Sequence, residues 1–531
     1  MRRNLSFDYV IVGSGPAGCV LANRLSQNTS LRILLIEAGG SDRRIIIRMP
    51  AAFAMAARHK DLDWGFLTEP EKYLGGRRIL EHRGKVLGGS SSINGMVANR
   101  GNQMDYDGWA REGLSDWSFQ TCLPHFKNLE SFQMGSNVWR GGNGPQSIEV
   151  SNVTQALSHA YLSAGKEAGY DVIDDQNGQR QEGFHITQTL TKNGRRASAA
   201  DSYLKPAIRR CNLLIETNCF VQKVEFSGNR AVKVITEKNG EIIKFEAQRE
   251  IILCAGAINT PKILMLSGIG EKSHLAEHDI KPIVDLPSVG KNLENHAIAP
   301  IIYGTPPGVS LSEELNGWRK YRVGLQWLLF KNGIGASTIC EVGSFFKSSN
   351  DAKYPDLQHE FYPLSSLIQG EKSNFGGGFM FSMGLMRPKS KGVIRLNSAN
   401  PKDDPRIIYK FLSCDYDTKI LTRGLWKTRE IAQQKAFSGL QTSEITPGPS
   451  IVSDTDIKCW LKNSVSTEYH PSSSCRMGVD DNSVTNQVGL VHNTEALRIV
   501  DASIMRSNVT ANLNVPVLMI AEKISATLFA D

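Results

Sequence analysis

The stretch 7-FDYVIVGSGPAGCVLANRLSQNTSLRILLIEAGG-40 decides the fold that this chain adopts. Residues 9–12 and 32–36 are short apolar runs, which predict two buried strands. Residues 17–25 between them predict a helix, and a glycine-rich turn joins that helix to the first strand. A strand, a glycine-rich turn, a helix and a second strand in this order are typical of a Rossmann unit that binds a dinucleotide.

Four residues of this stretch suit a dinucleotide for separate physical reasons. Gly13, Gly15 and Gly18 form a GxGxxG motif: they allow a tight turn, a close approach of the backbone to a pyrophosphate, and close packing of helix on strand. The helix N-terminus offers unpaired N–H groups to the phosphates. Glu37 follows the second strand, where an acidic side chain accepts hydrogen bonds from an adenosine ribose and disfavours NADP. The motif alone leaves NAD and FAD open.

Composition places the chain among ordinary globular proteins. It has 531 residues, 40% of them hydrophobic and 21% charged, which is enough for two or three domains. The net charge is +8, but the basic residues are spread rather than clustered with aromatic residues, so no nucleic-acid partner is predicted. The nine cysteines contain no CxxC pair, which argues against a disulfide framework and a zinc site. No metal site is predicted.

The same features predict a cytoplasmic protein. No run approaches the roughly 18 apolar residues of a membrane-spanning helix. The basic residues Arg2 and Arg3 are not followed by a separate apolar segment, so no signal peptide is expected. Scattered cysteines fit a reducing compartment. The positive charge leaves open a peripheral contact with the inner face of a membrane, although solubility is the simpler interpretation.

Two further stretches are rich in glycine. In 83-RGKVLGGSSSINGM-96, small residues could bring backbone amides against a flat ring or a phosphate, and the apolar residues among them do not suit a flexible linker. In 256-GAINTPKILMLSGIG-270, Pro261 predicts the first turn of a helix and Gly268 its C-terminal cap.

These stretches, together with 286-LPSVGKNLENH-296 and the C-terminal HP and NLNVP motifs, resemble the glucose–methanol–choline (GMC) flavoprotein oxidoreductases over nearly the whole chain. Within that family the chain is similar to bacterial choline dehydrogenases and related alcohol dehydrogenases. The resemblance implies an α/β protein with a discontinuous Rossmann-like FAD-binding domain and a second, α+β substrate-binding domain. The expected FAD-binding segments are 1–45, 75–150, 205–300 and 455–531, and the expected substrate-binding segments are 155–204 and 301–454.

The resemblance implies FAD rather than NAD. It places Gly13, Gly15 and Gly18 at the pyrophosphate and Glu37 at the adenosine ribose. Over the pyrophosphate and isoalloxazine it places Gly84, Gly88, Gly89, Ser90, Asn94 and Gly95. The backbone of Val221 would meet the adenine, and Asp501 and Ala502 the ribityl–phosphate side. Choline oxidases that attach FAD covalently have a histidine where this chain has Ile93, so noncovalent FAD is expected.

Oxidation of an alcohol to an aldehyde needs a base for the hydroxyl proton and a donor that holds the oxygen, while the flavin takes the hydride at N5. His470 of 467-TEYHPSSSCRMG-478 has the ordinary pKa of about 6.5 that suits the base. The resemblance assigns its partner to the residue two before Pro516, which is Asn514; Asn512 is a lesser candidate. On the residues alone, packing in a loop is favoured for His470 and helix capping for Asn514, and the resemblance reverses this order. No GxSxG elbow accompanies Ser472–Ser474, which are expected to shape the pocket.

The substrate is less defined. Glu341 matches a glutamate of choline-oxidising relatives, and a carboxylate near aromatic rings suits a quaternary ammonium. Relatives that oxidise alkanols keep this glutamate, so choline and another primary alcohol both stay open, as do O2 and a quinone as electron acceptor. Candidate pocket aromatics are Trp327, Phe330, Phe361, Tyr362, Phe379 and Phe381.

Three alternatives differ in chemistry: a hydroxynitrile lyase-like flavoprotein, a flavin-binding protein without turnover, and a nicotinamide dehydrogenase. Arg506 replaces a proline common in relatives and receives no role. The other histidines are predicted to be structural or exposed.

Overall fold

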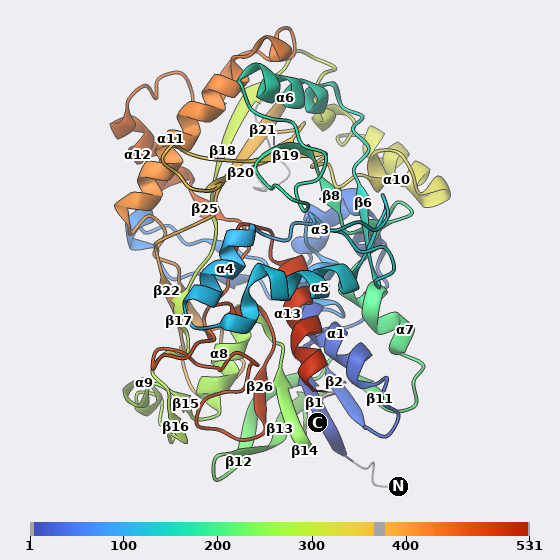
Figure 1. Ribbon diagram of the computed structural model, residues 1–531, viewed down its shortest axis with the longest axis vertical. Helices are drawn as coiled ribbons and strands as arrows, with labels where there is room; N and C mark the ends of the chain where they lie inside the picture. The colour runs from blue at the N-terminus through green and yellow to red at the C-terminus, as the bar shows by residue number, and fades with distance from the viewer. Residues whose placement is uncertain (1–4, 366–376, 529–531) are drawn as a thin grey trace.

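The computed structural model describes residues 5–365 and 377–528. The basic residues Arg2 and Arg3 and part of the segment predicted for substrate binding therefore lie outside the described residues. Two main sheets lie one beyond the other along the long axis of the molecule (Figure 1). The predicted α/β class, with a Rossmann-like part and a second sheet, is confirmed.

The first sheet has the strand order β11-β2-β1-β14-β13-β12, with β26 beside β14. Strand β1 pairs in parallel with both β2 and β14, and β14 pairs in parallel with β26, which is the arrangement of a Rossmann core. The strands are β1 (Ser6–Val12), β2 (Ile33–Ile36), β11 (Leu213–Glu216), β12 (Phe220–Ser227), β13 (Arg230–Lys238), β14 (Glu241–Leu253) and β26 (Leu497–Ile499). All four residues of β2 are buried, because helices cover both faces of a parallel sheet.

Helix α1 (Pro16–Leu25) follows β1 and packs against α13 (Asn514–Thr527), so the two ends of the chain meet in this half (Figure 1). Arg24 of α1 forms a bidentate ion pair with Glu522 of α13, at 2.7 and 2.9 Å. A β-carbon on Gly18 would lie 1.9 Å from the carbonyl oxygen of Gly13, so only glycine allows α1 to pack this closely on the turn.

The second sheet is antiparallel, with the order β24-β18-β21-β20-β19-β7 and β25 beside β18. Its strands are β7 (Gly183–Ile186), β18 (Ala297–Gly304), β19 (Val342–Phe346), β20 (Leu357–Tyr362), β21 (Gly378–Leu385), β24 (Glu444–Thr446) and β25 (Ser466–Thr467). Strand β18 crosses the domain boundary predicted at residue 300. Strand β25 comes from the segment predicted for the FAD-binding domain, yet it pairs with β18.

Successive side chains of β20 and β21 point to opposite faces of the sheet, one toward the core and the other toward the cavity. Phe361, Phe379 and Phe381 stack with Phe437 and with Tyr161 of α6 (Ala156–Glu167), beneath helices α6 and α11 (Asp415–Ala432). These three phenylalanines are therefore core residues and not pocket aromatics. The intervening side chains point to the opposite face of the sheet, toward the Rossmann half.

Helix α8 (Gly256–Leu266) begins five residues before Pro261, so the expectation that this proline opens the helix is wrong. Proline has no N–H to donate to the carbonyl four residues back, that of Ala257. The hydroxyl of Ser474 donates to this carbonyl instead, at 2.6 Å. Gly268, with φ +87°, follows the helix as a left-handed C-terminal residue, as predicted.

The remaining helices are α2 (Ile45–Arg48), α3 (Phe53–Ala57), α4 (Gln103–Arg111), α5 (Phe119–Leu129), α7 (Lys205–Ala207), α9 (Lys272–Ala276), α10 (Arg319–Phe330) and α12 (Asp454–Ser464). The short strands are β3 (Phe66–Leu67), β4 (Leu80–Glu81), β5 (Glu130–Phe132), β6 (Gln146–Val150), β8 (Gln188–Thr189), β9 (Thr191–Lys192), β10 (Arg195–Arg196), β15 (Ile269–Gly270), β16 (Val284–Asp285), β17 (Lys291–Leu293), β22 (Gly392–Arg395) and β23 (Arg406–Ile408). Within the described ranges no helix is both long enough and apolar enough to cross a bilayer. All nine cysteines are free thiols.

Candidate active site

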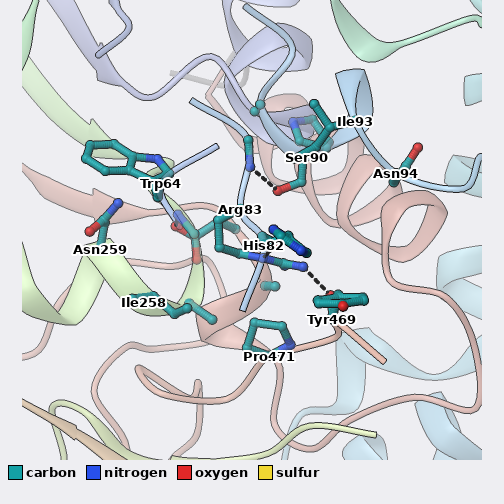
Figure 2. Close-up of a pocket in the computed structure, with 18 of the residues that line it drawn as sticks. Trp64, His82, Arg83, Ser90, Ile93, Asn94, Ile258, Asn259, Tyr469 and Pro471 are labelled. Atoms are coloured by element: carbon teal, nitrogen blue, oxygen red, sulfur yellow. Dashed lines mark hydrogen bonds between the residues drawn. The ribbon is translucent and has the colours of Figure 1, made fainter. Parts of the chain in front are cut away.

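A cavity lies between the two sheets. Its wall contains the turn after β1, parts of the 83–97 stretch, the start of α8, Glu360 and Tyr362 of β20, and His470 with the residues around it. Figure 2 shows Arg83 in this wall, with a dashed line from its guanidinium to the carbonyl oxygen of Tyr469 at 2.6 Å. The same figure shows the hydroxyl of Ser90 accepting from the backbone N–H of Gly84, at 3.1 Å.

The two glycine motifs touch and leave one end of the cavity without side chains. A β-carbon on Gly89, whose φ is +53°, would lie 2.7 Å from the α-carbon of Gly15. One on Gly84 would lie 2.3 Å from the carbonyl of Gly89. Gly13, with φ +98°, allows the turn between β1 and α1. Gly18 and Gly88 are packed behind this surface and are not part of the wall.

Glu37 lies at the far end of the cavity, near Val221. Its carboxylate accepts from the N–H and hydroxyl of Ser14, at 2.9 and 2.7 Å, and from the N–H of Gly39, at 2.8 Å. Burial raises the pKa of Glu37, and these hydrogen bonds oppose the rise. Glu37 thus places carboxylate oxygens in the cavity wall, and these suit the hydroxyl groups of a ligand.

Two buried charged residues hold the walls in place. Asp501 accepts from the N–H of Gly256 and the hydroxyl of Thr260, at 2.9 and 2.6 Å, which fixes the start of α8 to the loop that contains Ala502. Arg196 donates to the carbonyl and side-chain oxygens of Asn94, at 2.6 and 2.8 Å. Arg196 was not predicted as a site residue.

Together these residues fit FAD. A surface free of β-carbons suits a pyrophosphate, Glu37 suits a ribose, and the amide of Asn514 faces the cavity with both polar atoms buried and without a hydrogen-bond partner among the described residues. Ile93 is buried in the wall near Asn94 and Gly95.

His470 is held by its backbone from two sides. Strand β25 ends three residues earlier, the N–H of His470 donates to Asn295 at 2.9 Å, and Asn508 donates to the carbonyl of His470 at 3.2 Å. Burial lowers the pKa of His470 to about 4, against the raising influence of Glu360. The imidazole is therefore neutral at pH 7 and able to accept a proton.

Asn512, and not Asn514, lies beside the His470 ring. The side-chain nitrogen of Asn512 is 3.4 Å from Nε2 of His470 and donates to Glu360 at 2.9 Å. Its oxygen accepts from Asn99 at 2.8 Å and from Gln358 at 3.4 Å. These two donors assign the amide orientation, so Asn512 presents an N–H to Nε2, and Nε2 is the unprotonated nitrogen of the ring.

The predicted pairing of Asn514 with His470 is therefore corrected. Helix α13 begins at Asn514 rather than after Pro516, which lies in the first turn, where its missing N–H costs nothing. Asn514 is the first helical residue and Leu513 the N-cap, so Asn514 does not cap the helix either. Asn512 precedes the helix and reaches His470 from the loop.

Glu360 and Tyr362 face the cavity from β20. The Tyr362 hydroxyl donates to Glu360 at 2.7 Å, and the other carboxylate oxygen accepts from Asn512. Burial raises the pKa of Glu360, and the neighbouring Glu468 raises it further. Glu360 was missed in the sequence, because its only signal is the alternation of residues 358–362.

Glu341 is not a pocket residue. Its carboxylate accepts from the hydroxyl of Thr154 at 2.8 Å and from the N–H groups of Thr154 and Gln155, at 3.2 and 3.3 Å, just before α6. A carboxylate at a helix N-terminus is stabilised there by the unpaired N–H groups. The expectation that Glu341 binds substrate is wrong for this geometry.

Other predicted residues lie away from the cavity. Phe330 is 69% exposed on α10, and the Trp327 indole donates to the carbonyl of Gly194. Ser472–Ser474 are buried behind the wall. Arg506 bridges Glu112 and Asp480, at 2.6 and 2.7 Å, which gives it a structural role.

His296 was predicted to be merely structural, yet its Nδ1 lies 3.1 Å from Nδ1 of His470. Burial, and then His470, lower the pKa of His296 well below its ordinary value. With Glu468, the two histidines form a cluster. One ring nitrogen of each histidine and one carboxylate oxygen all lie within 4.8 Å of one another.

The chain is also similar to known proteins in sequence and in fold. The N- and C-terminal profiles of the GMC oxidoreductases match residues 7–298 and 388–521. The chain belongs to the GMC oxidoreductase family. As a member, it is an FAD-dependent oxidoreductase, and the resemblance seen in its sequence is confirmed.

Similar proteins cover nearly the whole chain. The oxygen-dependent choline dehydrogenase 1 of Chromohalobacter salexigens is 42% identical over 532 residues, 99% of this chain and 95% of that protein. The oxygen-dependent choline dehydrogenase of Brucella suis is 41% identical over 520 residues, 98% of this chain and 94% of the other. The crystal structure of pyridoxine 4-oxidase from Mesorbium loti matches with a TM-score of 0.90 at 27% identity and covers 99% of both chains. Formate oxidase of Aspergillus oryzae, at 24% identity and TM-score 0.93, shares the fold.

Proposed function

We propose that this GMC oxidoreductase oxidises a primary alcohol that carries a quaternary ammonium group, with choline as the leading candidate. One observation carries the proposal: the Glu360 carboxylate lies in the cavity wall, joined through Asn512 to His470. A carboxylate here would attract a cation to within reach of the base. The names of the relatives described above support the same substrate class.

His470 would be the base, and Asn512 the donor. The unprotonated Nε2 would exchange its long contact with Asn512 for the substrate and take the hydroxyl proton as the alcohol is oxidised. The N–H of Asn512 would stabilise the negative charge that develops on the same oxygen. FAD bound in the glycine cradle would supply the hydride acceptor.

FAD would be held without a covalent bond. The residues that would hold it are those of the glycine surface, Glu37, Val221, Asp501 with Ala502, and Asn514. Ile93 has no nucleophilic atom, so acid precipitation should leave the yellow flavin in the supernatant. Flavin in the pellet would contradict this assignment.

The two halves of the molecule would bind different ligands. The first sheet and its helices would hold FAD, and the second sheet would present Glu360 and Tyr362 to the substrate. We place the boundary just before β18, because that strand lies wholly in the second sheet.

The test is anaerobic stopped-flow reduction of the flavin by choline and by its uncharged isostere, 3,3-dimethylbutan-1-ol. Choline should reduce the wild type at concentrations about 10-fold or more below those that the isostere needs, since opposite charges about 4 Å apart attract by roughly 1–4 kcal/mol between bulk water and a protein surface. Glu360→Gln should remove most of that preference. Admitting air then shows whether O2 reoxidises the flavin. Absence of reduction by any alcohol would overturn the proposal.

A further inference from the structure

Glu468 is a buried carboxyl group that lies close to two histidine rings. It lies two residues before His470, is 8% exposed, and lines the cavity. Neither of its oxygens forms a hydrogen bond within the described part of the chain. A buried polar group of this kind is costly to the fold and rare in native proteins, so its presence calls for a functional reason.

The carboxyl group lies behind the His470 ring, on the side away from Asn512. Oε2 of Glu468 is 3.6 Å from Nδ1 of His470 and 3.6 Å from Nδ1 of His296. The two imidazoles are nearly perpendicular, at 85°. Strand β21 has Gly384 at this place, where a β-carbon would lie 3.0 Å from Oε2. The sheet thus leaves room for the carboxyl group.

The hydrogen bonds of Asn512 set the proton positions in this cluster. Nε2 of His470 accepts, so Nδ1 of His470 has the proton and donates to Nδ1 of His296, which in turn accepts. When Nε2 takes a proton from a substrate, the O–H bond breaks, an N–H bond forms, and the ring gains a positive charge. His296 is a neutral acceptor and cannot balance that charge.

Other ionisable groups near His470, His296 and Glu468 either form hydrogen bonds with other residues or are more distant. Glu360 is on the opposite side of the ring and accepts from Tyr362 and Asn512. Arg83 lowers the pKa of His470 and Glu81 raises it, and Arg387 lowers the pKa of His296. Among these acidic groups, Glu468 is therefore the one that lies next to Nδ1 of His470 and can balance a positive charge on the ring.

We propose that Glu468, as a carboxylate, stabilises the imidazolium that forms on His470 when this base takes the proton of the alcohol. It is a positioning and charge-balancing residue, since it acts through His470 and no bond to it is made or broken. The inference rests on the proposed function, because it requires His470 to act as the base.

The burial of Glu468 gives this role a pH signature. Burial raises the pKa of Glu468 to about 8, so the group is protonated and uncharged below that pH and charged above it. An opposite charge within about 4–6 Å moves the pKa of its neighbour by about 1–3 units. The rate of flavin reduction at saturating substrate should therefore rise about 10-fold as the pH increases through about 8.

The test compares this rate from pH 6 to pH 10 in holoenzymes with full flavin absorbance. Glu468→Gln keeps the size of the side chain but cannot ionise, so it should match the wild type within about 3-fold at pH 6 and lack the rise above pH 8. Glu468→Asp should recover part of the rise. Glu360→Gln, whose carboxyl group is on the other side of the ring, should keep it.

Each result has a distinct meaning. A full rise retained in Glu468→Gln would overturn this inference alone. A rise lost equally in Glu360→Gln would assign the titration to the wrong group and would also overturn it. Lack of reduction of the wild type by any alcohol at any pH would overturn the proposed function and this inference together.

Discussion

The side-chain nitrogen of Asn512 lies 3.4 Å from Nε2 of His470, and its side-chain oxygen is held from behind by Asn99. This arrangement does two things at once. It fixes the direction in which the amide presents its N–H group, and it leaves the lone pair of His470 directed at the cavity. The base and the donor thus meet at one place, where a hydroxyl group of a substrate would lie.

Substitution of the two asparagines should separate their roles. Asn512→Ala removes the donor near Nε2, so the rate of flavin reduction should fall about 100-fold while FAD stays bound. Asn514→Ala should instead weaken FAD binding and shift the flavin spectrum, because the Asn514 amide faces the cavity and has no hydrogen-bond partner among the residues that the structure describes. Stopped-flow reduction and FAD titration measure the two effects. The reverse pattern would return the catalytic assignment to Asn514.

The contact between the glycine motifs predicts that Gly89 cannot be replaced. Gly89→Ala should yield protein without FAD, since its β-carbon would come 2.7 Å from Gly15 in the cradle. Gly75→Ala is the matched control: its φ is also positive, +66°, but no atom lies within 4 Å of the added carbon. Both changes cost about 1–2 kcal/mol through the left-handed backbone. Retained FAD absorbance in Gly89→Ala would contradict the close approach.

Glu341 should matter for stability and not for substrate. Glu341→Ala removes the acceptor for Thr154 and Gln155 before α6, so the free energy of unfolding should fall by about 2 kcal/mol. The substrate concentration for half-maximal reduction should change less than about 2-fold, in contrast to Glu360→Gln. An increase equal to that of Glu360→Gln would restore Glu341 to the binding site.

The buried His359 predicts a loss of stability in acid. Burial lowers its pKa to about 3, whereas an unfolded histidine titrates near 6.5. Between these values the unfolded chain binds more protons than the folded one, so stability is complete above about pH 6.5 and falls as the pH decreases. From pH 7 to pH 5 this residue alone should cost about 2 kcal/mol.

Urea unfolding at the two pH values measures this contribution by difference. His359→Gln, though less stable overall, should lose less stability than the wild type between pH 7 and pH 5. His159→Gln, at an exposed position, should change by the same amount as the wild type. An unchanged pH dependence in His359→Gln would show that this ring does not resist protonation.

Prediction from sequence succeeded where local rules are strong. The turn around Gly13, the strand before it and α1 after it follow from periodicity and from the special geometry of glycine, and these need no knowledge of distant residues. The helix starts were less certain. Pro261 is inside α8 because Ser474, far along the chain, satisfies the carbonyl that proline leaves free, and no local pattern contains that information.

The candidate site was predictable only in part for the same reason. His470 has a recognisable motif, but its neighbours Glu360 and His296 come from strands whose pairing decides which side chains face the cavity. Glu341 illustrates the opposite error: the residue matched a motif, while the fold turned its carboxylate toward α6. Asn512 and Asn514 are two residues apart, so the starting point of one helix decided which of them reached the base.

The position of α13 has a consequence for how the protein is made. Strand β26 and helix α13 complete the first sheet and one wall of the cavity, and they follow every other part of the site along the chain. During synthesis from the N-terminus, the glycine surface leaves the ribosome long before Asn512 and Asn514 do. The wall of the cavity is therefore incomplete until Asn512 and Asn514 have left the ribosome. We expect FAD to be enclosed only at that late stage, and a chain cut before residue 512 would have the glycine surface but would lack the residue that lies beside His470.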